Sequence, residues 1–129
     1  MTEQLSLKHE RVEDIPLLLA QIERMQVPKL LDEGFPTHGN WEGLSLGHVV
    51  GVWLAVILSE ANHRMSHVEP WAGRRLQTLS SCLGMEVRAL DFSDDRLAAA
   101  LDYLRVDAAW QKFERRLNQH LVRVYDLRP

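Results

Sequence analysis

The sequence predicts an all-α fold, a compact bundle of about five helices around a buried apolar central helix. Apolar residues recur at spacings of three and four along most of the chain, and no long stretch alternates in the way of a half-buried strand. The segment from Leu44 to Ser59 contains no Asp, Glu, Lys or Arg. A membrane span needs about 20 apolar residues, so this shorter segment is predicted to be the core of a soluble domain.

Prolines and serines that favour the first turn of a helix predict where the helices begin. Pro16, Pro28 and Pro70 each mark a first turn, where the missing backbone N–H of proline does no harm. Ser45 and Ser93 each precede an apolar run and are predicted to cap it through the hydroxyl group. The predicted helices are, in order, residues 14–25, a short segment 29–33, the central helix 45–60, then 70–83, 94–105 and 107–125.

The central helix is expected to supply the core, with these side chains buried: Val49, Val50, Trp53, Leu54 and Ile57. Gly47, Gly51 and Ala55 lie four apart on it and form a stripe of small residues. Each glycine inside a helix costs about 0.5–1 kcal/mol relative to alanine, so a close contact has to offset that cost. We expect a second helix to cross there; a ligand groove is the alternative.

Composition favours one soluble domain of 129 residues, with 46% hydrophobic and 26% charged residues. The single cysteine, Cys82, excludes an intramolecular disulfide and a cysteine-rich zinc site, and we expect it to be a small core residue rather than a reactive thiol.

The N-terminus has no apolar signal core and no transit-peptide pattern, so a cytoplasmic protein without membrane contact is expected. Its polar residues 1–11 are candidates for disorder.

Charge is segregated along the chain. Residues 1–104 carry 9 Lys and Arg against 15 Asp and Glu, a net charge of −6. Residues 105–129 carry 6 against 3, a net charge of +3. Such an asymmetry can mark a binding face on a chain that is acidic on average.

The last predicted helix, residues 107–125, has two faces when successive residues are placed about 100° apart. Its apolar seam can pack against its own domain or against a partner helix, and consists of Trp110, Phe113, Leu117, Leu121 and Val124. Its basic side can follow a phosphate backbone and is the candidate DNA-binding site, consisting of Lys112, Arg115, Arg116, Gln119 and Arg123. A solvated face without a ligand is the alternative.

No catalytic residue, metal site or cofactor site is predicted. His63 and His67 lie four apart and could share a metal on a continuous helix, but Arg64 occupies the place of the glutamate that a zinc-protease helix needs. We interpret the two histidines as hydrogen-bonding groups that fix the turn before the next helix. Asp94 and Asp95 are interpreted as favourable charges at a helix start.

Three segments together resemble a known family. They are ERVEDIPLLLAQIERM, THGNWEGLSLGHVVGVWLAVILSEANHRMSHVEPW and LDFSDDRLAAALDYL, and the resemblance extends from Arg11 to Pro129. The chain is similar to the N-terminal domain of one group of bacterial insertion-sequence transposases, in which an RNase-H-like catalytic domain with an Asp/Asp/Glu metal site follows. The resemblance implies that the catalytic residues lie beyond Pro129 and that this chain is not itself an enzyme.

The same resemblance implies a function in DNA transposition, through binding of the element ends, self-association as a homodimer, or both. Two alternatives remain open. One is a protein–protein interaction module that never contacts DNA. The other is a small enzyme or metal-binding protein that uses the region of His63 and His67.

Overall fold

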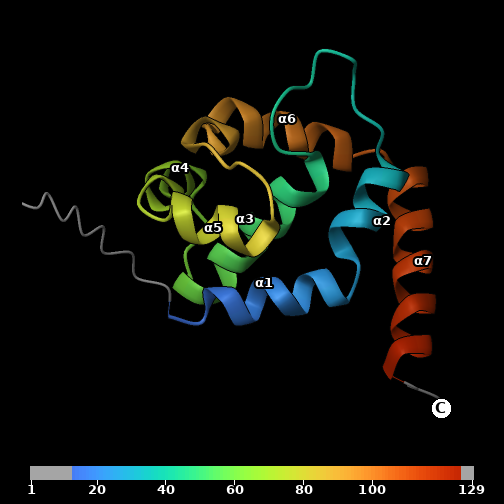
Figure 1. Cartoon of the computed structure of the whole chain (residues 1–129). Helices are drawn as coiled ribbons and strands as arrows, with labels where there is room; N and C mark the ends of the chain where they lie inside the picture. Colours follow the sequence, from blue (N-terminus) through green and yellow to red (C-terminus); the bar gives the residue numbers. More distant parts are fainter. Residues whose placement is uncertain (1–12, 126–129) are drawn as a thin grey trace, which may run out of the picture.

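The computed structural model describes residues 13–125, with side chains as far as Arg123, and the regular structure in this part is entirely helical (Figure 1). The all-α prediction is confirmed, although the described part holds seven α-helices rather than about five. The elements are α1 (Ile15–Arg24), α2 (Val27–Gly34), α3 (Leu46–Glu60), α4 (Met65–Gly73), α5 (Leu76–Leu83), the 3-10 helix η1 (Ala89–Phe92), α6 (Asp94–Leu104) and α7 (Asp107–Tyr125). The expectation for residues 1–11 lies outside the described residues.

Helix α3 occupies the centre, as predicted, and packs against α1, α2 and α6 (Figure 1). Helix α4 packs on η1 and α6, while α5 packs on α1. Helix α7 stands at one edge of the molecule alongside α2. Among the helices described, none has the length and apolar character that crossing a membrane requires.

Both predicted serine caps are present. The Ser45 hydroxyl accepts a hydrogen bond from the His48 backbone N–H at 3.2 Å, and Ser93 does the same for Arg96 at 3.2 Å. These caps satisfy backbone donors that have no partner within the first turn of a helix, and so they fix where α3 and α6 begin.

The predicted helix 70–83 is wrong in its extent. The chain forms α4 and α5 instead, and Pro70 lies inside α4. Arg75 is buried at the break, where its guanidinium lies 4.5 Å from the centre of the Trp71 ring and donates to the Trp71 carbonyl at 3.0 Å. The break lets the two short helices turn their apolar faces toward different neighbours, which one straight helix could not do.

The face of α3 that forms the core also differs from the prediction. Val49 and Trp53 are buried as expected, but three of the expected core residues are only partly buried, namely Val50, Leu54 and Ile57. Residues on the other side of the helix are fully buried instead, namely Val52, Ala55 and Val56. Periodicity could not select the inner face because almost every position of α3 is apolar.

The stripe of small residues marks a helix crossing, as expected. A Cβ atom on Gly47 would lie 2.0 Å from the carbonyl oxygen of Pro28 in α2, so only glycine fits at this position. The Gly47 backbone N–H also donates to the Asp32 carboxylate at 2.7 Å. A Cβ on Gly51 would lie 3.4 Å from the Pro28 ring and 3.5 Å from Ile22, which is ordinary contact.

These two glycines give a matched test of the crossing. Gly47→Ala is expected to lower the free energy of unfolding by at least about 2 kcal/mol, because backbone atoms of α2 have to move. Gly51→Ala should be neutral or stabilising by up to about 1 kcal/mol, because alanine favours the helix and meets no clash. Chemical unfolding followed by circular dichroism measures both, and equal effects would contradict the crossing.

Trp53 tests the burial of α3. Trp53→Ala is expected to lower the free energy of unfolding by about 3–5 kcal/mol, through lost apolar contact and the cavity left behind. Trp53→Phe should cost clearly less, because it keeps most of the apolar surface and removes an indole N–H that is buried without an acceptor among the described residues. An unchanged thermal midpoint for Trp53→Ala would show that this side chain is not part of the core.

Candidate functional site

Helix α7 is fixed to the domain through one side. Phe113 is buried there, and the centre of its ring lies 6.2 Å from that of Phe35, which follows α2. Trp110 joins this cluster, with its ring centre 6.3 Å from Phe35, although 37% of its surface stays exposed. Leu117 and Leu121 are partly buried on the same side, so the predicted apolar seam faces the domain. The side chain of Val124 lies outside the described part.

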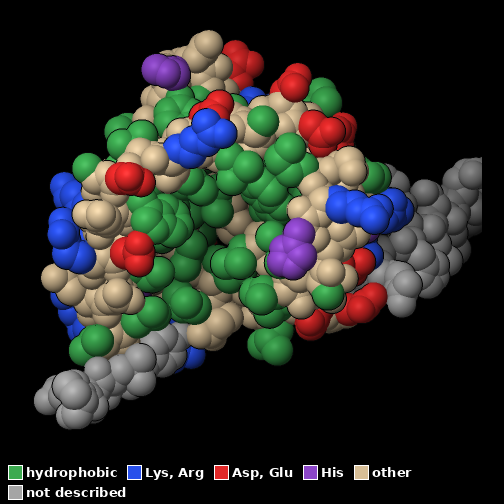
Figure 2. All heavy atoms as spheres, turned by 180° about the vertical axis from the view of Figure 1, so that it is seen from behind, with side chains coloured by type: hydrophobic (Ala, Val, Ile, Leu, Met, Phe, Trp, Pro, Cys, Tyr) green, Lys and Arg blue, Asp and Glu red, His purple; other side chains and the backbone are tan. Residues whose placement is uncertain are grey.

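Four of the five predicted DNA-binding residues share the exposed side of α7. We call this set the basic face, and it consists of Lys112, Arg115, Gln119 and Arg123. Figure 2 shows a column of Lys and Arg side chains along the edge of the molecule that α7 forms. Within the described part of α7, no carboxylate of the helix interrupts the face, because Asp107 and Glu114 lie on other sides of the helix by their spacing.

Arg116 differs from the other four. Its guanidinium forms an ion pair and hydrogen bond with the Glu33 carboxylate of α2, so it turns away from the basic face and toward the domain. The Arg116 side chain is 39% exposed and the Glu33 side chain is 41% exposed, so solvent screens this ion pair. Arg116 therefore helps to seat α7, and part of its charge is already neutralised.

The histidine pair does not lie on one helix. His63 stands in the exposed loop between α3 and α4, whereas His67 lies in the first turn of α4 with its Nε2 atom 3.7 Å from the Glu60 carboxylate. Within the described residues, no three His, Cys, Asp or Glu side chains gather closely enough to hold a metal ion. The distance of 3.7 Å between His67 Nε2 and the Glu60 carboxylate is too long for a hydrogen bond, and His67 Nε2 is buried without a hydrogen-bond partner among the described residues, so the hydrogen bond expected of this histidine is not formed at that atom.

Cys82 is exposed on α5, so the expectation that it fills the core is wrong. In α5 it is Leu79 that is fully buried, whereas Cys82, three residues further along the helix, is left in solvent. Asp94 and Asp95 are exposed in the first turn of α6, the place that the sequence predicts for them.

The structure also forms a groove that the sequence did not indicate. It lies between the segment that leads into α3 and the outer side of α6, and its main lining residues are His38, Trp41, Leu90, Asp95, Arg96, Ala99, Asp102, Tyr103 and Val106. We call it the α6 groove. The residues that form it come from two segments, 38–41 and 90–106, which are separated by almost 50 positions in the sequence, so no local pattern could indicate it.

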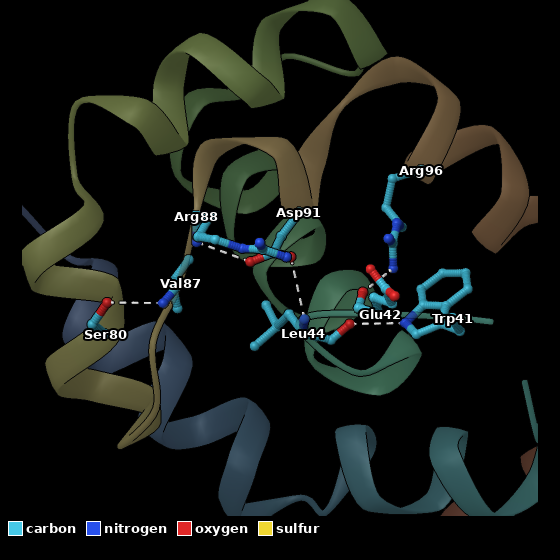
Figure 3. Close-up of polar contacts among 8 residues, drawn as sticks. All are labelled: Trp41, Glu42, Leu44, Ser80, Val87, Arg88, Asp91 and Arg96. Carbon is cyan, nitrogen blue, oxygen red and sulfur yellow. Dashed lines mark hydrogen bonds and ion pairs between the residues drawn. The ribbon is translucent and has the colours of Figure 1, made fainter. Parts of the chain in front are cut away.

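Aromatic rings form one wall of the α6 groove. The ring centre of Tyr103 lies 5.7 Å from that of His38 and 5.8 Å from that of Trp41, and the Tyr103 hydroxyl accepts a hydrogen bond from the His38 backbone N–H at 2.9 Å. Arg96 extends from α6 over the Trp41 ring at 4.2 Å and donates to the Glu42 carbonyl at 2.6 Å (Figure 3). These contacts tie the loop to α6.

A buried carboxylate, that of Asp91, holds the segment that leads into α3. Asp91 in η1 is 1% exposed, and its two oxygens accept hydrogen bonds from the Leu44 N–H at 3.2 Å and the Arg88 N–H at 2.9 Å (Figure 3). The Arg88 guanidinium lies 3.6 Å from the same carboxylate. Gly43 adopts a φ of +81°, and a Cβ there would lie 2.3 Å from the carboxylate, so glycine is required beside it.

A scan against models of protein families, a search of curated proteins and a search of solved structures each found no match to this chain. By its fold and surfaces, the chain is a helical domain with an exposed basic face and a separate aromatic groove.

The role of Asp91 can be tested against a neighbouring acid. Asp91→Ala is expected to lower the free energy of unfolding by about 3 kcal/mol or more, because it leaves the buried Leu44 N–H and the part-buried Arg88 N–H without their acceptor. Asp94→Ala, which removes an exposed carboxylate from the first turn of α6, should cost less than about 1 kcal/mol. Urea unfolding of both variants measures the difference, and similar losses would contradict the anchoring role.

Proposed function

We propose that this domain is a non-catalytic module that binds duplex DNA through the basic face of α7, as the N-terminal part of a transposase. The observation that carries the proposal is the basic face itself: three cations and an amide lie exposed on one side of a helix whose opposite side is fixed to α2. An anchored helix of this kind presents its charges without having to order them on binding.

The spacing of the basic face suits a phosphate backbone. Lys112 and Arg123 are eleven residues apart, which corresponds to about 16 Å along a helix. Duplex DNA carries one phosphate charge for about every 1.7 Å of its axis, so each cation can lie near a phosphate. Contacts of this kind hold the protein on DNA but do not read the base sequence.

In a transposase, such a module would hold the ends of the element or bring two copies together. The strand-transfer chemistry would belong to a separate catalytic domain, which uses divalent ions to activate the reacting oxygens. The resemblance in sequence supports this assignment, and so does the separation between the acidic body of the domain and the basic face of α7.

A protein-interaction module without DNA contact is the second candidate, and an apolar surface favours it. Val50, Leu54 and Ile57 share one side of α3 and stay partly exposed, and Leu58 beside them is 58% exposed. Figure 2 shows hydrophobic side chains gathered around a hollow at the centre of one face of the molecule. Apolar side chains that gather on an exposed face can mark a protein interface.

Salt dependence of DNA binding tests the leading proposal. With three phosphate contacts, the logarithm of the affinity for a short fluorescent duplex should fall with the logarithm of salt concentration with a slope of about −3. Arg115→Ala with Arg123→Ala should reduce the magnitude of that slope by about 2 and leave the helix content unchanged. Fluorescence anisotropy titrations at several salt concentrations measure the slope.

Two further variants sharpen the same experiment. Arg64→Ala with Arg74→Ala removes two exposed cations outside α7 and should leave the slope unchanged. Glu33→Gln releases Arg116 from its ion pair and should steepen the slope by about 1. Undetectable duplex binding at low salt, or equal effects of the two double variants, would reject the DNA proposal and leave the interaction module as the better candidate.

A further inference from the structure

We propose that the α6 groove receives the basic face of α7 from a second copy of this chain, so that the domain pairs with itself through two reciprocal contacts. This inference goes beyond DNA binding and does not require it. It rests on the charges, the spacing and the apolar ends of the two surfaces.

The free charge of the groove is negative. Arg96 is already committed to the Trp41 ring and to the Glu42 carbonyl. The Asp95 carboxylate is exposed and has no ion-pair partner within residues 13–125, while Asp102 makes only an exposed contact with Arg105, at 3.6 Å. A ligand with two cations can therefore find two accessible carboxylates along α6.

The spacing of these carboxylates matches that of the cations on the basic face. Asp95 and Asp102 are seven residues apart, or about 10 Å along α6, and Arg115 and Arg123 are eight residues apart, or about 12 Å along α7. The groove residues of α6 between the two carboxylates are Arg96, which is turned onto the Trp41 ring, and Ala99, a small side chain that lets another helix approach closely. Two helices lying side by side can thus form both ion pairs.

Exposed apolar side chains at the edges of the α6 groove and of the basic face fit the same side-by-side packing of the two helices. Leu90 and Val106 line the groove and are 67% and 55% exposed. On α7, Val122 lies beside Arg123 and is 43% exposed. Contact among these side chains would remove apolar surface from water on both copies.

A basic face that enters this groove belongs to a second copy, because α7 is held away from the groove of its own chain. Phe113 and the ion pair between Arg116 and Glu33 hold α7 against α2, with the basic face directed outward. Each copy carries one groove and one basic face, so a two-fold dimer forms the contact twice. DNA and the second copy would then compete for the basic face.

Charge exchange tests this pairing. Sedimentation velocity over a concentration series at low salt should show a monomer–dimer equilibrium for the natural chain. Asp95→Lys with Asp102→Lys should weaken dimerisation by more than about tenfold, and Arg115→Asp with Arg123→Asp should do the same, because each places like charges together. The four changes combined should restore it. Glu86→Lys, an exposed change outside both surfaces, is the control and should have no effect.

DNA binding separates this inference from the proposed function. The Asp95→Lys with Asp102→Lys variant should still bind duplex DNA, because its changes leave the basic face intact. The combined variant should dimerise yet bind DNA weakly. A chain that stays monomeric at all concentrations, or a combined variant that does not recover, would overturn the pairing. A change in helix content is checked by circular dichroism for each variant.

Discussion

The close crossing of α2 over α3 determines where the other parts of this domain lie. At Gly47 the two helix backbones approach so closely that no side chain fits between them, and the Gly47 N–H is held by Asp32 of α2. The position of α2 in turn places Glu33 and Phe35, which hold α7 through an ion pair and an aromatic cluster. A contact in the core thus orients the basic face of α7 at the edge of the molecule.

Asp91 provides a second, independent constraint. Burying a carboxylate is costly unless hydrogen bonds replace its water, and here two backbone N–H groups and the Arg88 guanidinium take that place. Because one of those donors belongs to Leu44, the carboxylate ties η1 to the loop that carries Trp41. The aromatic wall of the α6 groove is therefore built on a rigid base rather than on a free loop.

The two candidate surfaces use charge in opposite ways. The basic face of α7 offers three cations and, among the described residues of the helix, no carboxylate on the same side, whereas the α6 groove offers two carboxylates beside an arginine that is already engaged. Both surfaces belong to exposed sides of helices whose other sides are buried, so binding would need little rearrangement of the fold. Sharing one basic face between DNA and a second copy would link the assembly state of the domain to its occupancy by DNA.

The sequence alone determined the helical class, the caps at Ser45 and Ser93, the small-residue crossing and the two faces of α7, because each follows from chemistry within one or two turns. Tertiary structure alone decided the rest. The break at Arg75, the exposure of Cys82, the inner face of α3 and the pairing of Arg116 all depend on which helices meet. The α6 groove joins residues remote in sequence, and local periodicity carries no information about such neighbours.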